Sequence, residues 1–288
     1  MTSPDDSLSR APFFIVGCPR SGTTLLRRTD DLEAILAYST FPRMNLEPEE
    51  VRRRVREAAP RDYAALVRLV MGMYAEQQGK PRWGDKTPRY VDHVALLARW
   101  LPDALFVHVI RDGRDVAASL RESSGSPIAS AALFWRRRVE LGRRAGSRLG
   151  PSRYLETRLE DLVAAPEAEL TRICRHLGEE FHPSMLTGGR ELDAAALSYR
   201  ERHLRSPPTP GLRDWRAGLT AVEQRQAEEV CRPLLLRLGY PVGGRPSRAV
   251  AVGAHATRAV DVVSRAPAFV RRRGKELEEV AGGPRPPG

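Results

Sequence analysis

The chain has 288 residues, of which 41% are hydrophobic, and it carries a net charge of +11. This length and apolar content predict one α/β domain with a sizeable core and a tail, while the lack of any run of about eighteen apolar residues excludes a transmembrane helix. Three scattered cysteines exclude a disulfide framework, no Cys or His spacing suits a metal, and an aromatic fraction of 6% without a recognition helix or RNA-binding signature argues against a nucleic-acid partner.

The chain opens with an acidic stretch, Met1-Thr2-Ser3-Pro4-Asp5-Asp6, that has no apolar signal region. We therefore expect a disordered lead over residues 1–12 and a cytoplasmic protein. The main domain is expected over residues 13–243, followed by a tail over residues 244–288.

The first structured stretch is a short apolar run, Phe13 to Val16, followed by a glycine-bounded loop and a helical pattern from Thr23. Such a strand, loop and helix start form a phosphate cradle, because backbone N–H groups point into the loop and the helix N-terminus adds positive charge. Gly17 and Gly22 have the G-x-x-x-x-G spacing of a P-loop, but Thr23 stands where that motif has lysine. Arg20, inside the loop, offers a fork suited to a phosphate or sulfate oxyanion. A strand–turn–helix without a ligand is the alternative for this stretch taken alone.

Helical patterns follow before the next strand. The first extends from Thr23 to about Ala37, and a charged, solvated helix is expected over 49–59. A third helix begins at about Arg61 and presents an apolar face that is most simply core. A further helix is expected over 91–101.

A second anion site is predicted at the end of the next strand. The buried run 105–110 ends in Arg111-Asp112-Gly113-Arg114-Asp115, and a helical pattern then leads to Ser119. Because ligands of open α/β sheets bind at the C-terminal strand ends, an arginine at two such ends predicts a ligand with phosphates at two separate places.

The second half of the chain continues the alternation of helical and strand patterns. It reads as a long helix that starts after Ser126-Pro127, then a strand over 153–159. Three arginines at 136–138 on this helix form a solvated face, with contact of one of them to the ligand as the alternative. Helices over 166–178 and 223–238 follow, separated by a loop rich in Arg, Ser and Pro at 200–213.

These residues resemble the sulfotransferases that use 3′-phosphoadenosine 5′-phosphosulfate (PAPS). The loop from Gly17 to Thr24 is similar to their 5′-phosphosulfate loop, in the arginine version of tyrosylprotein sulfotransferases and many bacterial members. Arg111 and Ser119 resemble the pair that holds the 3′-phosphate, and Gly84-Asp85-Lys86-Thr87-Pro88 resembles the segment that carries a transfer-site lysine. The likeness extends in order from about Phe13 to about Tyr240. It implies an α/β, P-loop-type three-layer fold with a central, mostly parallel sheet flanked by helices.

The resemblance also implies a reaction and its residues. A sulfuryl group would move in line from PAPS to a hydroxyl or amine, without a metal, on a small-molecule, glycan or peptide acceptor. The loop at 200–213 would act as a lid. The catalytic candidates are Arg20, Lys86 and Glu33. The expected donor-binding residues are Gly17, Pro19, Arg20, Ser21, Gly22, Thr23, Thr24, Arg111 and Ser119.

Two departures from the family pattern keep alternatives open. Relatives carry a glutamate segment shortly after the first helix, and here the chain passes straight from Leu26 toward Glu33, as if a few tens of residues were absent. Asp85 and His93 are the other candidate bases, and Leu159 stands where the family has tyrosine. A degenerate nucleotide-binding relative with little turnover and a P-loop kinase are therefore the alternative functions.

The tail after Gly244 differs in composition from the rest. It holds nine basic and four acidic residues, and valines alternate with arginines before Arg271-Arg272-Arg273. It reads either as a solubilising tail or as an amphipathic segment that touches anionic lipid at a membrane surface.

Overall fold

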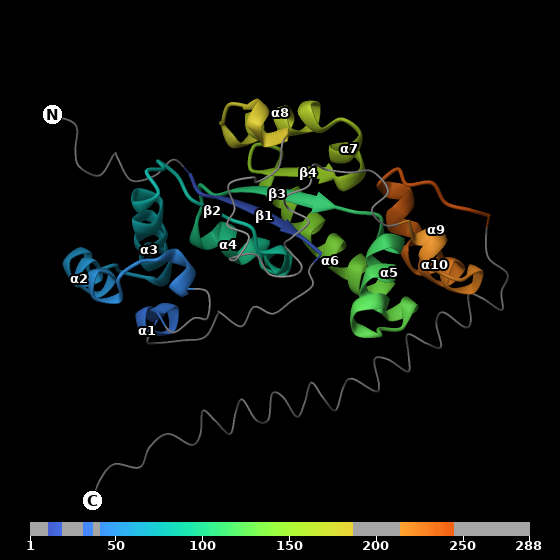
Figure 1. Ribbon diagram of the computed structural model, residues 1–288, viewed down its shortest axis with the longest axis horizontal. Coiled ribbons are helices and arrows are strands. Elements are labelled where there is room, and N and C mark those ends of the chain that lie inside the picture. The colour runs from blue at the N-terminus through green and yellow to red at the C-terminus, as the bar shows by residue number, and fades with distance from the viewer. Residues whose placement is uncertain (1–10, 19–30, 37–40, 187–213, 245–288) are drawn as a thin grey trace, which may run out of the picture. The chain divides into compact units, whose positions relative to one another are not determined.

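The computed structural model describes residues 11–18, 31–36, 41–186 and 214–244 (Figure 1). The expected lead up to residue 10, most of the phosphate loop, the loop at 200–213 and the tail beyond Gly244 lie outside the described residues. The chain divides into two compact units, one formed by Met1–Ile110 with Arg138–Pro210 and the other by Arg111–Arg137 with Gly211–Gly288.

The first unit contains a sheet that confirms the expected α/β fold. Its strands in the described part of the chain are β1 (Phe13–Gly17), β2 (Gly84–Asp85), β3 (Leu105–Ile110) and β4 (Tyr154–Arg158). Their order is β2-β1-β3-β4, and every neighbouring pair is parallel. β2 was not predicted, because two residues are too few to give a hydrophobic pattern.

The register of β1 and β3 brings the start of the phosphate loop beside the end of the neighbouring strand. Gly17 pairs with Val109, so both strands reach the same edge of the sheet together. A Cβ at Gly17 would lie 3.0 Å from the carbonyl oxygen of Val109, tighter than a side chain accepts easily. Glycine thus lets the chain leave β1 close against β3.

Helices cover both faces of this sheet, which confirms the three-layer arrangement. On one face, Phe14, Phe106 and Tyr154 pack in a buried cluster with α4 (Val94–Trp100) and the later turns of α6 (Ile128–Leu149). On the other, Thr157 donates to Glu169 of α8 (Pro166–Leu177) at 2.9 Å. α4 and α8 accordingly lie on opposite sides of the strands (Figure 1).

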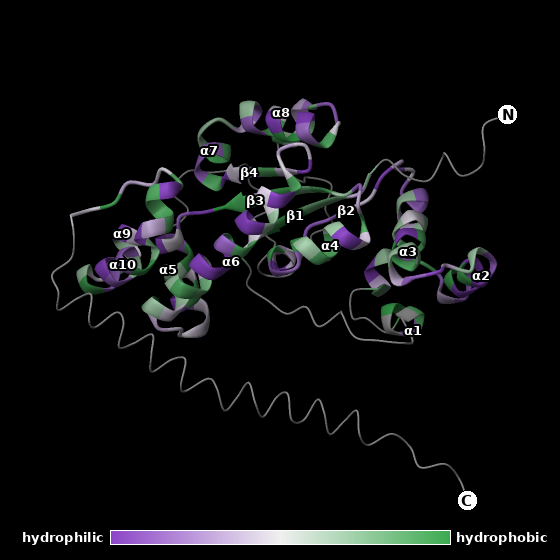
Figure 2. Ribbon diagram, turned by 180° about the vertical axis from the view of Figure 1, so that it is seen from behind, coloured by the Kyte–Doolittle hydropathy of each residue, from purple (hydrophilic) through white to green (hydrophobic). Residues whose placement is uncertain are grey.

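The segment between β1 and β2 is helical and has its own buried cluster. It comprises α1 (Asp31–Leu36), the 3₁₀ turn η2 (Phe41–Met44), α2 (Pro48–Ala58) and α3 (Tyr63–Gln77). The cluster is formed by the side chains of Phe41, Val51, Leu66, Val70 and Met73. Hydrophilic residues dominate α2, whereas hydrophobic ones gather along β1 and β3 (Figure 2). The predicted helices at 49–59 and from about Arg61 are confirmed.

Elsewhere in the first unit the structure refines the expected elements. The helix expected over 91–101 is divided into a 3₁₀ turn, η3 (Pro88–Asp92), and α4, with a non-helical φ of −127° at His93. β4 leads directly into α7 (Leu159–Ala164), and η4 (Pro183–Leu186) follows α8.

The second unit holds α5 (Gly113–Ser124), the first turns of α6, α9 (Trp215–Gly218) and α10 (Ala221–Arg237). Thr220 and Glu223 form a reciprocal capping box at the start of α10, which satisfies two N–H groups that the helix leaves open. Gly113 lies against Trp135, where a Cβ would come within 2.4 Å of the indole ring. In the described parts of the chain, no helix is both long and apolar enough to cross a membrane.

Candidate functional site

The described part of the phosphate loop ends at Cys18. Burial raises the pKa of the Cys18 thiol to about 12, so the thiol stays protonated at neutral pH. A protonated thiol of this kind suits a packed residue rather than a reactive nucleophile. The predicted donor-binding residues from Pro19 to Thr24, including Arg20, lie outside the described residues.

An ion pair that the sequence did not reveal acts on Cys18. Arg138 Nη2 lies 3.2 Å from Asp92 Oδ2, and both side chains are largely buried. Both charges influence the pKa of Cys18, the arginine lowering it and the aspartate raising it. The expected solvated face over 136–138 therefore holds for Arg137 alone, because Arg136 donates to the carbonyl of Val230 at 3.3 Å. No local sequence pattern could have predicted this ion pair, because Asp92 and Arg138 are far apart in sequence and meet only in the folded chain.

The Gly-Asp-Lys-Thr-Pro segment forms β2 and the turn after it. A Cβ at Gly84 would lie 2.3 Å from the Phe13 ring, so this strand position needs glycine. Thr87 Oγ1 donates to Asp85 Oδ1 at 2.7 Å. Burial raises the pKa of Asp85, while hydrogen bonds from Thr87 and Tyr90 and the charge of Lys86 act in the opposite direction. Lys86 itself is exposed.

Glu33 is held by an arginine on α2. Its two carboxylate oxygens accept from Nε and Nη2 of Arg52 at 2.8 and 2.9 Å, and its side chain is 57% exposed. The hydrogen bonds from Arg52 lower the pKa of Glu33. A proton acceptor with a lowered pKa is a weaker base, so this environment suits a surface ion pair better than catalysis.

An apolar cavity of about 190 Å³ lies in the first unit. Its wall contains Asp85 and His93, the other two candidate bases, among aromatic and aliphatic side chains. The structure therefore brings Asp85 and His93 to one cavity.

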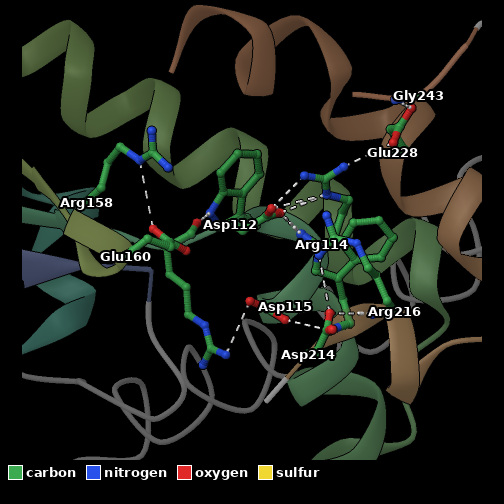
Figure 3. Close-up of polar contacts among 12 residues, drawn as sticks. Asp112, Arg114, Asp115, Arg158, Glu160, Asp214, Arg216, Glu228 and Gly243 are labelled. Atoms are coloured by element: carbon green, nitrogen blue, oxygen red, sulfur yellow. Dashed lines mark hydrogen bonds and ion pairs between the residues drawn. The ribbon is translucent and has the colours of Figure 1, made fainter. Parts of the chain in front are cut away.

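The two arginines of Arg111-Asp112-Gly113-Arg114-Asp115 have different surroundings in the second unit. Arg114 is 1% exposed, and its guanidinium bonds to Asp112 and to Glu228, at 2.7 and 3.0 Å in the closest contacts (Figure 3). Its guanidinium carbon also lies 4.2 Å from the centroid of the Trp215 ring. All of this makes Arg114 a structural residue.

Arg111, in contrast, has a side chain that is 28% exposed. Its Nη2 lies 3.4 Å from Asp115 Oδ2, and Asp115 also accepts from the backbone N–H of Trp215 at 2.8 Å. Burial raises the pKa of Asp115, while the charge of Arg111 lowers it. Ser119 lies on α5, half-buried. Arg111 is thus the arginine of this motif with surface left for a ligand.

The end of β4 is basic as well. Arg158 Nε lies 3.7 Å from Asp161 Oδ2 and 4.0 Å from Glu160 Oε2, the latter pair drawn in Figure 3. Leu159, which stands where the family pattern has tyrosine, is the first residue of α7. Among the described residues, no group of three or more His, Cys, Asp or Glu side chains is placed to hold a metal ion.

A parallel sheet with a glycine-bounded loop after β1 and an arginine directly after β3 defines a P-loop-type α/β protein. A family model described as "Sulfotransferase family" matches residues 12–183. The chain belongs to this sulfotransferase family.

The chain also resembles a curated nodulation protein. The chain is 26% identical over 274 residues to the nodulation protein NoeE of Sinorhizobium fredii (strain NBRC 101917 / NGR234), a match that covers 79% of this chain and 65% of NoeE. The chain thus spans just under two thirds of the length of this curated relative.

One solved structure has the same fold, and a second is similar at a lower TM-score. The sulfotransferase domain of the Synechococcus PCC 7002 olefin synthase superposes with a TM-score of 0.56 at 23% identity, covering 84% of this chain and 99% of that domain. The sulfotransferase domain from the curacin biosynthetic pathway superposes with a TM-score of 0.47 at 20% identity, covering 82% of this chain and 100% of that domain.

Proposed function

We propose that this chain is a PAPS-dependent sulfotransferase that moves a sulfuryl group to a hydroxyl or amine acceptor without a metal. The observation that carries the proposal is the order of its motifs within a member of the family. The phosphate loop follows β1, the Lys86 segment forms β2 and its turn, and Arg111 follows β3. The pairing of Gly17 with Val109 supports this, because both strands then reach the sheet edge where ligands of such folds bind.

Each candidate residue receives a role in this proposal. Arg20, the loop amides and the hydroxyls of Ser21, Thr23 and Thr24 hold the 5′-phosphosulfate, and the glycines and Pro19 shape the loop. Arg111 and Ser119 hold the 3′-phosphate, which distinguishes PAPS from ATP.

Transfer itself depends on positioning and charge. The acceptor oxygen attacks sulfur in line as the bond from sulfur to the 5′-phosphate oxygen breaks, and negative charge gathers on the departing phosphate. Lys86 donates to that oxygen, since a compact ammonium approaches a bridging atom more closely than a guanidinium does.

A degenerate relative that binds the nucleotide with slow turnover is the second candidate. One observation favours it. Arg52 donates two hydrogen bonds to Glu33, so Glu33 is poorly suited to act as the general base that a glutamate supplies in the family. A P-loop kinase is disfavoured by Thr23 at the lysine position of the ATP-binding loop.

Calorimetry with the full chain separates these functions. A sulfotransferase and a degenerate relative both bind 3′-phosphoadenosine 5′-phosphate (PAP), the product of transfer from PAPS, more tightly than ATP. A kinase instead prefers ATP with magnesium. Transfer of label from PAPS into a mixture of alcohols, sugars and peptides then distinguishes the active sulfotransferase from the degenerate relative with slow turnover. Failure to bind PAP would refute the proposed function.

A further inference from the structure

The apolar cavity of the first unit has walls from well-separated parts of the chain. Phe14 comes from β1, Val67 and Met71 from α3, and Leu97 and Trp100 from α4. Phe14 packs edge-on against Trp83 and Tyr90, with ring centroids 5.7 and 6.0 Å apart. Tyr63 and Trp100 form a second aromatic pair at 5.1 Å. The walls therefore combine aromatic rings with aliphatic side chains.

The volume of the cavity limits what can occupy it. An engineered apolar cavity of about 150 Å³ accommodates a benzene molecule. At about 190 Å³, this cavity has room for one aromatic ring with a small substituent. The rings in the wall also favour an aromatic occupant, because edge-to-face contacts between rings add to the gain from burial.

One carboxylate stands in this wall, since Asp85 is the single acidic side chain among the described lining residues. It is oriented, because Thr87 Oγ1 donates to its Oδ1 at 2.7 Å and Tyr90 adds a second side-chain hydrogen bond. A carboxylate has about four lone-pair positions, so it can accept a further proton donor. Its chain neighbour Lys86 is the proposed transfer lysine.

We propose that this cavity receives the sulfuryl acceptor, a small aromatic alcohol of the phenol class, and that Asp85 takes the proton from its hydroxyl. The inference rests on the proposed function. In the step, the phenolic oxygen forms a bond to sulfur while the bond from sulfur to the 5′-phosphate oxygen breaks. The O–H proton passes to Asp85, and the products are an aryl sulfate and PAP.

The chemistry of the cavity favours a phenol over other hydroxyl compounds. A sugar carries several hydroxyls, each of which would lose its hydrogen bonds with water in an apolar enclosure. A phenol has one, and its pKa of about 10 lies far closer to that of a carboxylic acid than the pKa of an aliphatic alcohol does. Burial raises the pKa of Asp85 and makes it a better partner for that proton than Glu33, whose pKa is lowered by Arg52.

The acceptor class is tested with the full chain, labelled PAPS and three probes: phenol, hexan-1-ol and methyl glucoside. We expect phenol to be sulfated with the highest kcat/KM. PAP binding is measured in parallel and reports on the proposed function alone. A protein that binds PAP but prefers the glucoside or hexanol, or modifies none of the three, overturns the acceptor assignment and leaves the donor assignment intact.

The cavity is tested by filling it. Val67→Phe, on α3, should lower kcat/KM for phenol roughly tenfold or more, because the added ring takes space that the acceptor needs. PAP affinity should stay unchanged. The matched control is Leu141→Phe, at an exposed position of α6 outside the cavity, which should leave phenol turnover unchanged. Equal phenol kinetics in Val67→Phe and wild type would overturn the assignment.

Asp85 is tested by Asp85→Asn, which keeps an oxygen for Thr87 and Tyr90 but removes the base. We expect kcat for phenol to fall about 10²–10⁴-fold with PAP affinity retained, and Asp85→Glu to recover part of the loss. Asp103→Asn, at a surface aspartate paired with Arg68, is the control expected to match wild type. Wild-type turnover in Asp85→Asn, or a comparable loss in Glu33→Gln instead, would overturn the role of Asp85.

The pH profile of the wild-type chain gives a test that does not depend on a variant folding. Because Asp85 must be ionised to accept a proton, kcat for phenol should fall toward acid, with a midpoint above the ordinary pKa of aspartate. Lys86 and Tyr90 act on Asp85, and Tyr63 and His93 line the same cavity. His93 is the neighbour whose ordinary pKa lies nearest the range of the acid limb, so His93→Gln is measured alongside and should keep the same acid limb. A profile that is flat to pH 4, or a limb that disappears in His93→Gln, refutes the assignment.

Discussion

At the scale of residues, burial separates two arginines that the sequence places only three positions apart. Arg114 has its donors satisfied by Asp112 and Glu228 and its face covered by Trp215, so it can give nothing to a ligand without unpairing buried carboxylates. Arg111 Nη2 lies 3.4 Å from Asp115 Oδ2, and the Arg111 side chain remains 28% exposed. Of the two arginines, Arg111 is therefore the one for which we predict the phosphate-binding role.

Arg111→Ala should cost about 2–4 kcal/mol of PAP binding, the range for losing a charge-assisted contact to a desolvated phosphate. Binding of adenosine 5′-phosphosulfate, which lacks the 3′-phosphate, should barely change. Isothermal titration calorimetry with both ligands measures the difference. Arg137→Ala, at an exposed arginine, is the control for net charge. Equal losses for both ligands would make Arg111 a structural residue.

Lys86→Ala should lower kcat by about two to three orders of magnitude, because it removes one donor that acts on charge formed in the transition state. PAP affinity should fall much less. Single-turnover transfer from labelled PAPS measures the chemical step directly. Lys80→Ala, at another exposed lysine, should leave both values unchanged. A large affinity loss with normal turnover would assign Lys86 to ground-state binding.

At the scale of elements, α6 needs glycine where it lies against the sheet. A Cβ at Gly142 would come 2.6 Å from Val91 Cγ2 and 2.8 Å from His108 Cε1. One at Gly146 would come 2.2 Å from the Tyr154 ring. Small residues at these two positions allow the helix backbone to approach β3 and β4 closely.

Gly142→Ala should therefore destabilise the protein by about 1–3 kcal/mol, since the overpacking outweighs the helix propensity that alanine adds. Gly72→Ala in α3 is the matched control, because a Cβ there meets no atom within 4 Å. It should stabilise by about 0.5–1 kcal/mol. Urea unfolding of both variants measures the free energies. Stabilisation by Gly142→Ala would mean that α6 lies farther from the sheet than described.

Local sequence patterns predicted the long helices and strands. The short strand β2, the buried ion pair and the cavity depend on contacts between distant segments, which local patterns do not reveal. The apolar runs at 13–16 and 105–110 indicated strands because a buried parallel strand needs no partner to be recognisable. β2 has two residues, and its pairing with β1 depends on Phe13 lying over Gly84. Sequence motifs proposed Lys86 and Arg111 as site residues, and these roles stay predictions. The Asp92–Arg138 pair and the cavity wall could not be predicted from the sequence, because their residues come from separate parts of the chain and meet only in the fold.

At the scale of the whole molecule, a neutral histidine lies in the core beneath α6. His108 on β3 is fully buried, and its Nδ1 lies 2.5 Å from the hydroxyl of Tyr154. Within the described residues, its Nε2 has no hydrogen-bond partner. Burial lowers the pKa of His108 to about 3, and the charge of Arg143 adds to the effect. The folded protein therefore keeps this ring neutral where the unfolded chain would protonate it.

This difference predicts acid sensitivity of the fold. An unfolded histidine titrates near pH 6.5, so between that value and about pH 3 the unfolded state binds one proton more than the native state at this residue. Its contribution to stability is fully present above pH 6.5 and is lost by up to about 1.4 kcal/mol per pH unit as the pH falls through this window. Carboxylates contribute their own slopes, so a variant is needed to isolate the histidine.

His108→Asn removes the titrating group and keeps an atom that can bond to Tyr154. The variant should be less stable than wild type at pH 7, because the smaller side chain leaves a void. Its free energy of unfolding should nevertheless fall less steeply between pH 6 and pH 4, by up to about 1.4 kcal/mol per unit. Urea titrations of both proteins across this range measure the two slopes. Parallel slopes would mean that His108 is already protonated in the folded protein, and its place in the core would then require a buried counter-charge.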